Sequence, residues 1–187
     1  RLLKHIEDIR AAQQEVDGIA ILAGTEVDIM PDGSLDYSDD LLERLDIVVA
    51  SPHWSLTQKP AEATKRLLRA ITHPLVHIIG HPTGRLVNRR EGLSPDMKEL
   101  FAAAAEHTTA LEINANSARL DLRDAHVRGA LNAGCLIAID TDAHAIADFD
   151  QLRYGVLTAR RGGLTPARCL NTWPAPQLHA WLKAKRG

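Results

Sequence analysis

The chain has 187 residues, 45% of them hydrophobic and 25% charged, which suits a single soluble domain with a substantial core. Its formal net charge of −2 at pH 7 excludes binding to nucleic acid through overall charge attraction, so any such contact needs a local basic patch. No apolar run approaches the ~18 residues of a membrane helix, and the two cysteines form no CxxC pair. Aromatic residues, at 4%, are too few to form a surface on which bases stack. We therefore expect a cytoplasmic protein without membrane contact or disulfides.

The predicted elements begin with a helix and then alternate between strand and helix. Residues 2–9 place leucine and isoleucine at helical spacing, and the chain starts inside this helix without a methionine, so we expect a portion of a longer protein. Five apolar, β-rich runs follow, each ending in polar residues and leading into a helical pattern or loop. The strands are predicted within 19–29, 46–54, 76–85, 110–120 and 135–144, and the helices near 38–45, 60–72, 94–107 and 122–133.

Proline, serine and glycine mark several predicted helix ends. Pro60 and Pro95 are typical first-turn residues, and Ser94 is a suitable N-cap for the helix near 94–107. Gly134 follows a helical pattern and precedes a strand, where a glycine commonly ends a helix in the left-handed conformation.

The polar residues at the strand ends recur at a regular spacing. Strands that alternate with helices predict parallel βαβ units, and the apolar runs suit strands covered by helices on both faces. The end residues lie 27, 28, 33 and 28 positions apart, close to the ~30 residues of one βαβ unit, so each lies at the same place within its own unit. In a barrel-like α/β fold the carboxyl ends of the strands meet on one face, where active sites form. The residues concerned are Glu26, His53, His81, Asn114 and Asp142.

These residue types indicate a divalent metal site. Imidazole and carboxylate ligands without thiolates suit Zn, Mn or Fe(II), and two or three ions that share a carboxylate can polarise phosphate oxygens. In the stretch CLIAIDTDAH, Asp142 and His144 are two residues apart, so an extended backbone would point both side chains to one side. Asp140 lies two residues before Asp142, so its side chain would point to the same side, and it is expected to support the ligands from behind.

Simpler roles exist for each residue taken alone. A single histidine after a strand is more often structural than a ligand, Glu26 alone suits a cap or an ion pair, and Asp142 alone suits a helix N-cap. Five polar residues recur at the same place in successive βαβ units, and this recurrence favours a shared metal site over five separate roles.

Two arginines lie just beyond the strand ends. Arg85 is four residues past His81, and Arg119 is five past Asn114, so both are candidates to clamp phosphate oxygens bidentately, with Asn114 as a further substrate-binding residue. The ARRGG run at 159–163 is better explained as a solvated helix end than as a phosphate contact.

The remaining histidines are expected to have no role in the site. His73 and His77 precede a strand end and are predicted to be structural. The others fall on predicted helices and are expected to face solvent: His5, His107, His126 and His179.

Several motifs resemble one known family. Successive segments are similar to motifs of the polymerase-and-histidinol-phosphatase (PHP) domain, in the variants found at the C-terminus of family X DNA polymerases of bacteria and archaea. The likeness runs roughly from Ile6 to the final LNTWPAPQLHAWLK, and GHPTGR and EINANSARLDL are its most discriminating motifs. The segments are GTEVDIMPDGSLDY, VVASPHW, GHPTGR, LEINANSARLDL, IDTDAH and YGVLTARRGGL.

The resemblance implies a distorted seven-stranded (β/α) barrel with a site for up to three metal ions, Mn, Zn or Fe. By position in the motifs, Glu26 would bridge two ions, and His53 and His81 would ligate one of them. Asp142 would ligate another ion, and His144 a third. The resemblance also implies Mn-dependent 3′–5′ exonuclease activity and processing of DNA 3′ ends.

One part of the family pattern has no counterpart in this chain. The family's H-x-H motif on the first strand and a further T-D-H-like motif are expected before Arg1, with the polymerase core earlier still. We therefore expect residues 1–187 to form the C-terminal portion of a PHP domain, a partial (β/α)7 TIM-like barrel that lacks its first strands.

These observations predict a metal-dependent phosphoesterase that acts on DNA 3′ ends in DNA repair, with the polymerase core in cis as its partner. Catalysis is assigned to Asp142, His144, Arg85 and Arg119. Two alternatives stay open: a stand-alone PHP phosphatase for a small phosphoester such as histidinol phosphate, and a structural PHP module without catalysis.

Overall fold

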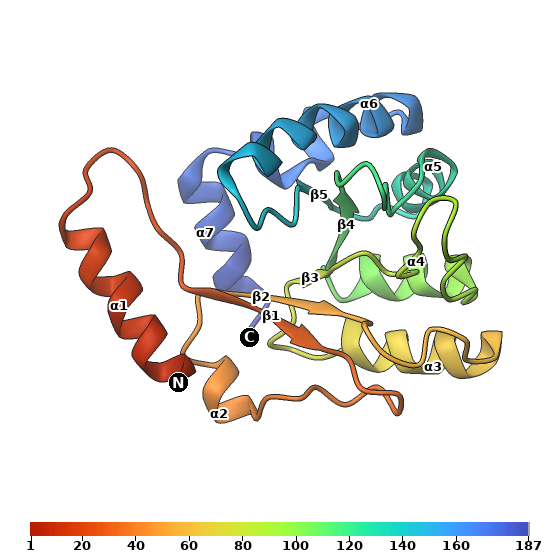
Figure 1. Cartoon of the computed structure of the whole chain (residues 1–187), viewed down its shortest axis with the longest axis horizontal. Helices are drawn as coiled ribbons and strands as arrows, with labels where there is room; N and C mark the ends of the chain where they lie inside the picture. The colour runs from red at the N-terminus through yellow and green to blue at the C-terminus, as the bar shows by residue number, and fades with distance from the viewer. Residues whose placement is uncertain (187) are drawn as a thin grey trace.

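Five short parallel strands form one sheet in the computed structural model, which describes residues 1–186 (Figure 1). Their order in the sheet is their order in the chain, as in the wall of an α/β barrel. The strands are β1 (Gly24–Asp28), β2 (Ile47–Ser51), β3 (Ile78–Ile79), β4 (Ala110–Asn114) and β5 (Ile137–Asp140).

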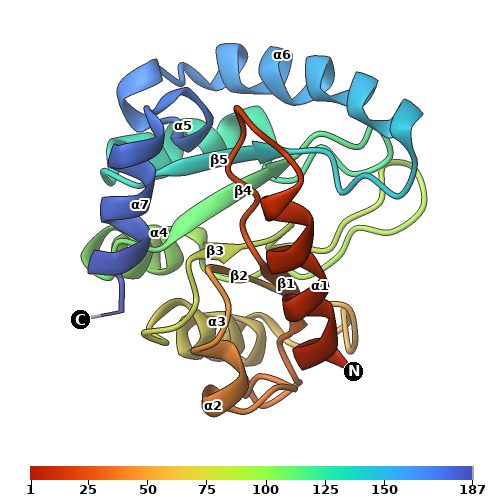
Figure 2. The ribbon, with the colours of Figure 1, turned by 90° about the vertical axis from the view of Figure 1, so that its left-hand side faces the viewer.

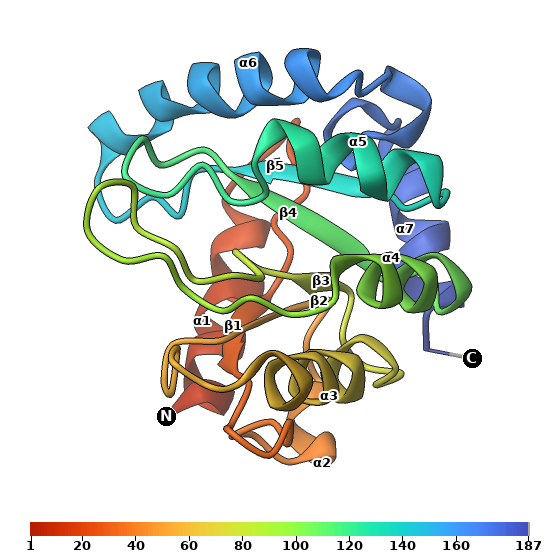
Figure 3. The same cartoon turned by 90° about the vertical axis from the view of Figure 1, so that its right-hand side faces the viewer.

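Helices follow the strands and cover the sheet. Figure 3 shows α3, α4 and α5 side by side in front of the sheet, with α6 running above them. Figure 2, from the opposite side, shows α1 and α7 on the other side of the molecule. The α-helices are α1 (Leu2–Gln14), α2 (Asp39–Leu42), α3 (Pro60–Ile71), α4 (Met97–Glu106), α5 (Asp124–Asn132), α6 (Leu152–Gly162) and α7 (Ala175–Ala184), and the 3-10 helices are η1 (Ile146–Gln151), η2 (Pro166–Arg168) and η3 (Leu170–Thr172).

The two faces of the sheet differ in polarity. One face packs on α3 to α6 and forms the main core, with residues such as Val48, Ile79 and Ile113 fully or almost fully buried. On the opposite face, the amino halves of the strands pack against Trp181 and Leu182 of α7. Toward the carboxyl ends this second face carries polar side chains instead: Glu26, Ser51, Glu112, Asn114 and Asp140.

The predicted α/β class with parallel, sequential strands is confirmed. Within residues 1–186, β1 is paired only with β2, and β5 is paired with β4 and bridged to Cys169, so no ladder joins β1 to β5. The sheet is therefore open along β1 in the part of the chain described. In that part, no helix has both the length and the apolar character needed to cross a membrane.

Most predicted boundaries hold to within a few residues. Pro60 begins α3, and Gly134 lies between α5 and β5 with a φ of +89°. The predicted N-cap at Ser94 and the predicted first-turn position of Pro95 are both wrong, because α4 begins at Met97. Asp96 caps it by accepting hydrogen bonds from Lys98 N (2.9 Å) and Glu99 N (3.2 Å). A carboxylate at the N-cap also complements the positive end of the helix dipole, which a serine hydroxyl cannot do.

Candidate metal centre

Three consecutive strand ends bring Glu26, His53 and His81 together. Glu26 lies on β1, while each histidine follows its own strand, β2 or β3, by two residues. The Nε2 atoms of the two imidazoles are 3.2 Å apart, and they lie 3.5 Å (His53) and 3.6 Å (His81) from Oε1 of Glu26. The three side chains thus direct one nitrogen or oxygen atom each toward a common point.

Carboxylates behind the two imidazoles fix their orientation. Nδ1 of His53 is hydrogen bonded to Asp28, which also accepts a hydrogen bond from Nε1 of Trp54 at 3.1 Å. Nδ1 of His81 lies 3.2 Å from Oε2 of Glu112, which also accepts the backbone N–H of His81. Such a carboxylate–histidine arrangement places the ring proton on Nδ1 and leaves the Nε2 lone pair free for a metal.

The spacing of the three atoms suits a divalent cation. Two Nε2 lone pairs facing each other at 3.2 Å repel unless a cation or a proton lies between them. Ligands at 2.0–2.1 Å from a tetrahedral ion lie about 3.3 Å from one another. The observed separations of 3.2, 3.5 and 3.6 Å match this value, so the residues present fit a bound ion.

The protonation of the cluster follows from the same contacts. Burial opposes ionisation of Glu26, but the hydrogen bond to His53 and the charge of the imidazoles lower the pKa of this carboxyl to about 2. Hydrogen bonds to Glu26 and Asp28 raise the pKa of His53 to about 9. Burial and the nearby Arg119 lower the pKa of His81. Because His53 must release its proton to ligate a metal, metal affinity is expected to weaken as the pH falls.

A buried pair of carboxyl groups supports His81 from behind. Burial raises the pKa of Glu112 to about 7, and burial together with the Glu112 carboxyl raises the pKa of Asp140 to about 10, since the two groups are hydrogen bonded. The pair therefore holds a proton at neutral pH. Glu112 is absent from the residues predicted from the sequence, although its place two residues before Asn114 on the same strand face is a usable signal. Asp140 supports a candidate ligand only through Glu112, and that ligand is His81.

A second polar group lies beside the three-residue cluster. Oδ2 of Asp142 is 3.6 Å from Nε of Arg119 and 3.4 Å from Nδ2 of Asn114. The charge of Arg119 acts on His81, and that of Asp142 acts on Asp140, so the two groups of residues are electrostatic neighbours. Asp142 has a φ of +52° and His81 a φ of +24°, conformations that L-residues rarely adopt and that concentrate at functional sites.

His144 and Arg85 differ from what their spacing suggested. β5 ends at Asp140, so the predicted extended backbone does not continue to His144, whose side chain is 83% exposed and whose Nδ1 lies 2.7 Å from the carbonyl oxygen of Asp142. The guanidinium of Arg85 donates to the carbonyl oxygens of Arg119 (2.9 Å from Nε) and Leu120, and therefore holds that loop.

The structure thus groups the candidate residues into two neighbouring sets and leaves two outside. Glu26, His53 and His81 form the first set, and Asn114, Arg119 and Asp142 form the second. His144 lies at the outer edge, and Arg85 binds the backbone of the loop that carries Arg119.

Known proteins similar to this chain include a DNA polymerase and two probable phosphatases. No family model matches the chain. It is 44% identical over 183 residues to DNA polymerase/3′-5′ exonuclease PolX of Bacillus subtilis (strain 168), a match that covers 98% of this chain and 32% of that protein. It is 30% identical over 196 residues to a probable phosphatase of Thermoanaerobacter sp. (strain X514), covering 98% of this chain and 76% of the relative. The probable phosphatase YcdX of Escherichia coli O81 (strain ED1a) is 31% identical over 180 residues, covering 91% and 71%.

A parallel α/β sheet with a histidine–carboxylate cluster at its strand ends defines a candidate metal-dependent hydrolase. The similarity to the two probable phosphatases, over more than two thirds of their length, gives the family: the chain belongs to the PHP family of phosphoesterases. The predicted family resemblance is confirmed. The chain spans about a third of the length of the PolX relative.

Proposed function

We propose that this domain is a divalent-metal-dependent 3′–5′ exonuclease that processes DNA 3′ ends in DNA repair, in the cytoplasm and in cis with a family X polymerase core. The 44% identity to PolX along 98% of the chain supports the nucleic-acid substrate. The observation that carries the proposal is the convergence of both Nε2 atoms on Glu26, with a carboxylate behind each ring. The sheet is proposed to be part of a distorted (β/α)7 barrel wall, since its strands follow chain order and one face ends in polar residues.

Glu26, His53 and His81 would hold one ion, with Mn, Zn and Fe(II) all compatible with these ligands. Asp142 and His144, whose Oδ1 and Nδ1 atoms lie 3.8 Å apart, are proposed to hold further ions in the intact centre, for a total of up to three. When bound, the metal would supply Lewis-acid polarisation of the phosphate and a more acidic water.

The residues of the chain itself position the reactants. Arg119 and Asn114, which already contact Asp142, are placed to orient non-bridging phosphate oxygens by charge-assisted hydrogen bonds. In the reaction the oxygen of water bonds to phosphorus, the bond to the 3′ oxygen breaks, and that oxygen gains a proton. Arg85 is proposed to position Arg119 by holding its carbonyl oxygen. Glu112 and Asp28 keep the imidazoles in their orientation throughout.

A second candidate function is hydrolysis of a small phosphomonoester. It is favoured by the 30% and 31% identity to probable phosphatases over 76% and 71% of their length. Both candidates use the same ligand set and differ only in the substrate.

The test compares degradation of 3′-labelled single-stranded DNA with hydrolysis of p-nitrophenyl phosphate, each with MnCl₂. We expect DNA to be the better substrate, and Glu26→Gln to abolish activity on it. His5→Gln, which changes an exposed histidine on α1, is the matched control and is expected to retain full activity. Hydrolysis of the small ester alone would support the second candidate, and absence of both activities would contradict a hydrolase.

A further inference from the structure

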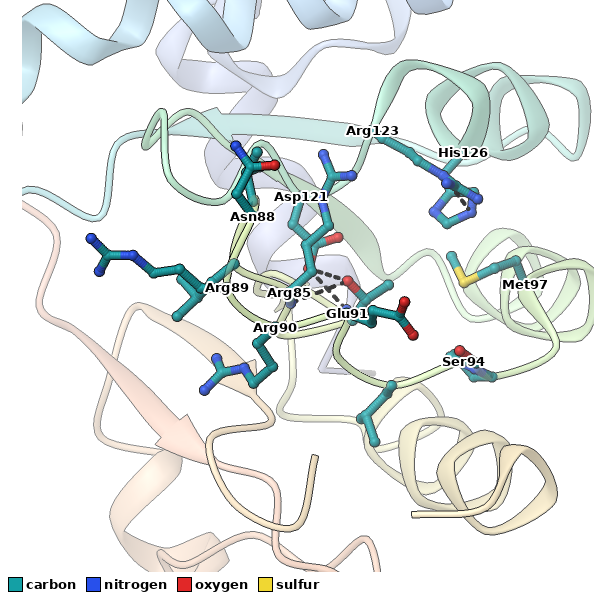
Figure 4. Close-up of a pocket in the computed structure, with 15 residues that line it drawn as sticks. Arg85, Asn88, Arg89, Arg90, Glu91, Ser94, Met97, Asp121, Arg123 and His126 are labelled. Atoms are coloured by element: carbon teal, nitrogen blue, oxygen red, sulfur yellow. Dashed lines mark hydrogen bonds between the residues drawn. The ribbon is translucent and has the colours of Figure 1, made fainter. Parts of the chain in front are cut away.

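A cavity of about 740 Å³ lies along the loop that follows β3 (Figure 4). Its walls are the 83–95 loop, the start of α4 at Met97, and Arg123 and His126 at the start of α5. The loop joins the cavity to the centre, because His81 belongs to the centre and Thr83, two residues later, lines the cavity. The two positions are at most about 8 Å apart along the backbone.

Four arginines line this cavity, and none of them forms an ion pair with a carboxylate among residues 1–186. By contrast, Arg10, Arg69 and Arg161 elsewhere on the surface each pair with an aspartate. The cavity therefore has four positive charges that no direct ion pair within residues 1–186 offsets. The four residues are Arg85, Arg89, Arg90 and Arg123.

Two carboxylates line the cavity and offset part of this charge. Asp121 is fully buried, and its Oδ2 accepts hydrogen bonds from Thr83 N (3.0 Å), Thr83 Oγ1 (2.8 Å) and Gly84 N (3.0 Å). Glu91 is exposed at the loop and is the other carboxylate in the lining. Four guanidinium groups against these two carboxylates leave an excess of positive charge suited to an anionic ligand.

His126 supplies a hydrogen-bond donor without a protein partner. Its Nε2 accepts a hydrogen bond from Nε of Arg123 at 3.2 Å, so the proton of the neutral ring is on Nδ1. Nδ1 is buried and has no partner among the described residues. A buried polar atom without a partner is costly, so Nδ1 is an unsatisfied donor within the cavity wall, below the surface that a ligand touches. The prediction that His126 faces solvent is wrong, because the side chain is half-buried between Arg123 and the ring of Phe101.

We propose that this cavity binds the phosphodiester backbone of a single DNA strand whose 3′ end lies at the metal centre. The inference rests on the proposed function and adds a second, metal-independent contact with its substrate. In Figure 4, Arg123 and His126 lie together on the α5 side, whereas the side chains of Arg89 and Arg90 extend from the loop away from α5, and Arg90 also donates to the carbonyl oxygen of Gly84 (3.0 Å from Nε). Guanidinium groups spread in this way suit successive phosphates along a strand better than one isolated phosphate.

The lining favours contacts with phosphates over contacts with bases. Apart from the imidazole of His126, the cavity has no aromatic side chain on which a base could stack. Binding is therefore expected to be independent of base sequence and to depend strongly on salt, since each phosphate contact by an arginine releases a counterion.

The test measures the affinity of the chain for fluorescein-labelled oligothymidine by anisotropy, in EDTA and over a series of NaCl concentrations. Arg89→Gln/Arg90→Gln and, separately, Arg123→Gln are the informative variants. Arg44→Gln/Arg160→Gln, which removes two exposed arginines that do not line the cavity, matches the first variant in charge. The slope of log K against log salt is expected to fall by about 0.7 for each arginine–phosphate interaction that a substitution removes, and affinity at low salt is expected to fall about tenfold in the double variant.

The matched control and a second substrate separate the possible results. Activity on p-nitrophenyl phosphate with Mn is expected to stay unchanged in all variants, because none alters the centre. If the cavity variants weaken DNA binding no more than Arg44→Gln/Arg160→Gln, the inference is overturned. If no phosphoester is cleaved but the cavity variants still reduce the salt slope, the binding site stands and the proposed catalytic function fails.

Discussion

The Nε2 atoms of His53 and His81 lie 3.2 Å apart, and the Nδ1 atom of each ring faces a carboxylate. With both ring protons directed away from the gap, the arrangement is unfavourable until a positive charge enters it. The protein supplies that charge as a proton on His53, whose pKa is raised to about 9 by Glu26 and Asp28. A divalent cation would replace this proton, so the centre is organised before the metal binds.

Loss of any one of the three ligands should abolish binding of the first ion. For His81→Ala we expect the increase in melting temperature caused by MnCl₂ to disappear, because a ligand stabilises only the folded state that it binds. Differential scanning fluorimetry over a series of Mn concentrations measures this effect. His179→Ala, which changes an exposed histidine on α7, is the control and should keep the full increase. An unchanged increase in His81→Ala would show that the ion binds elsewhere.

Replacement of the carboxylate behind His81 should weaken metal binding without unfolding the domain. Glu112→Gln keeps the shape and an amide oxygen, but removes the carboxylate that orients the imidazole through Nδ1. We expect metal affinity to fall about 10- to 100-fold, as is typical for partners of metal-ligating histidines. Isothermal titration with Zn or Mn gives the affinity, and urea unfolding without metal reports stability. A fully retained affinity would mean that Glu112 serves packing alone.

The sequence alone predicts the frame of this site well. The strand ends at Glu26, His53 and His81 follow from alternating apolar runs and a repeat of nearly 30 residues, because a parallel βαβ unit returns each strand to the same edge. The five predicted strands are all present, although each is shorter than its apolar run. The runs extend past the strands because the chain stays buried as it enters the loops of the site, as at His81 and Thr83.

The details that sequence reasoning missed depend on side-chain geometry beyond the strands. The left-handed conformation of Asp142 turns the chain after β5, so a strand period cannot place His144. Arg85 lies at the expected position after β3, but its guanidinium donates hydrogen bonds to backbone carbonyl oxygens. The role of Glu112 depends on a neighbour 31 residues earlier in the chain, which only the pairing of β3 with β4 reveals.

The buried His77 should make stability depend on pH in a defined direction. Its Nδ1 accepts the N–H of Val48 at 3.1 Å and its Nε2 lies 3.2 Å from the carbonyl oxygen of Leu182, which suits the neutral ring. Burial, together with the nearby Arg186, lowers the pKa of His77 from 6.5 to about 4. Below pH 6.5 the unfolded chain therefore binds a proton that the folded protein does not. At pH 5 this difference in proton binding lowers the free energy of unfolding by about 2 kcal/mol.

Comparison with a variant isolates this contribution, because buried carboxyl groups act in the opposite direction over the same range. Glu112 and Asp140 have raised pKa values, so their protonation favours the folded state as the pH falls. His77→Gln leaves those groups in place. We expect the variant to be less stable than the wild type at pH 7.5, and the difference in free energy of unfolding to shrink by about 2 kcal/mol at pH 5. Urea unfolding at both values measures it, and a constant difference would contradict the assignment.

The buried Arg66 should be essential to the strand-end loops that carry His53. Its side chain is 1% exposed, and its guanidinium donates to the carbonyl oxygens of Ile29 and Trp54 (2.8 Å) and to Oε1 of Gln58 (3.1 Å). Arg66→Met preserves the aliphatic stem but leaves these oxygens without donors, and an unsatisfied buried acceptor costs about 1–3 kcal/mol. We expect a loss of at least this size in urea unfolding. Arg69→Met, one turn along α3 and exposed to solvent, should change stability by less than about 1 kcal/mol. Equal losses of stability in the two variants would show that the buried hydrogen bonds of Arg66 contribute no more to stability than the contacts of the exposed Arg69.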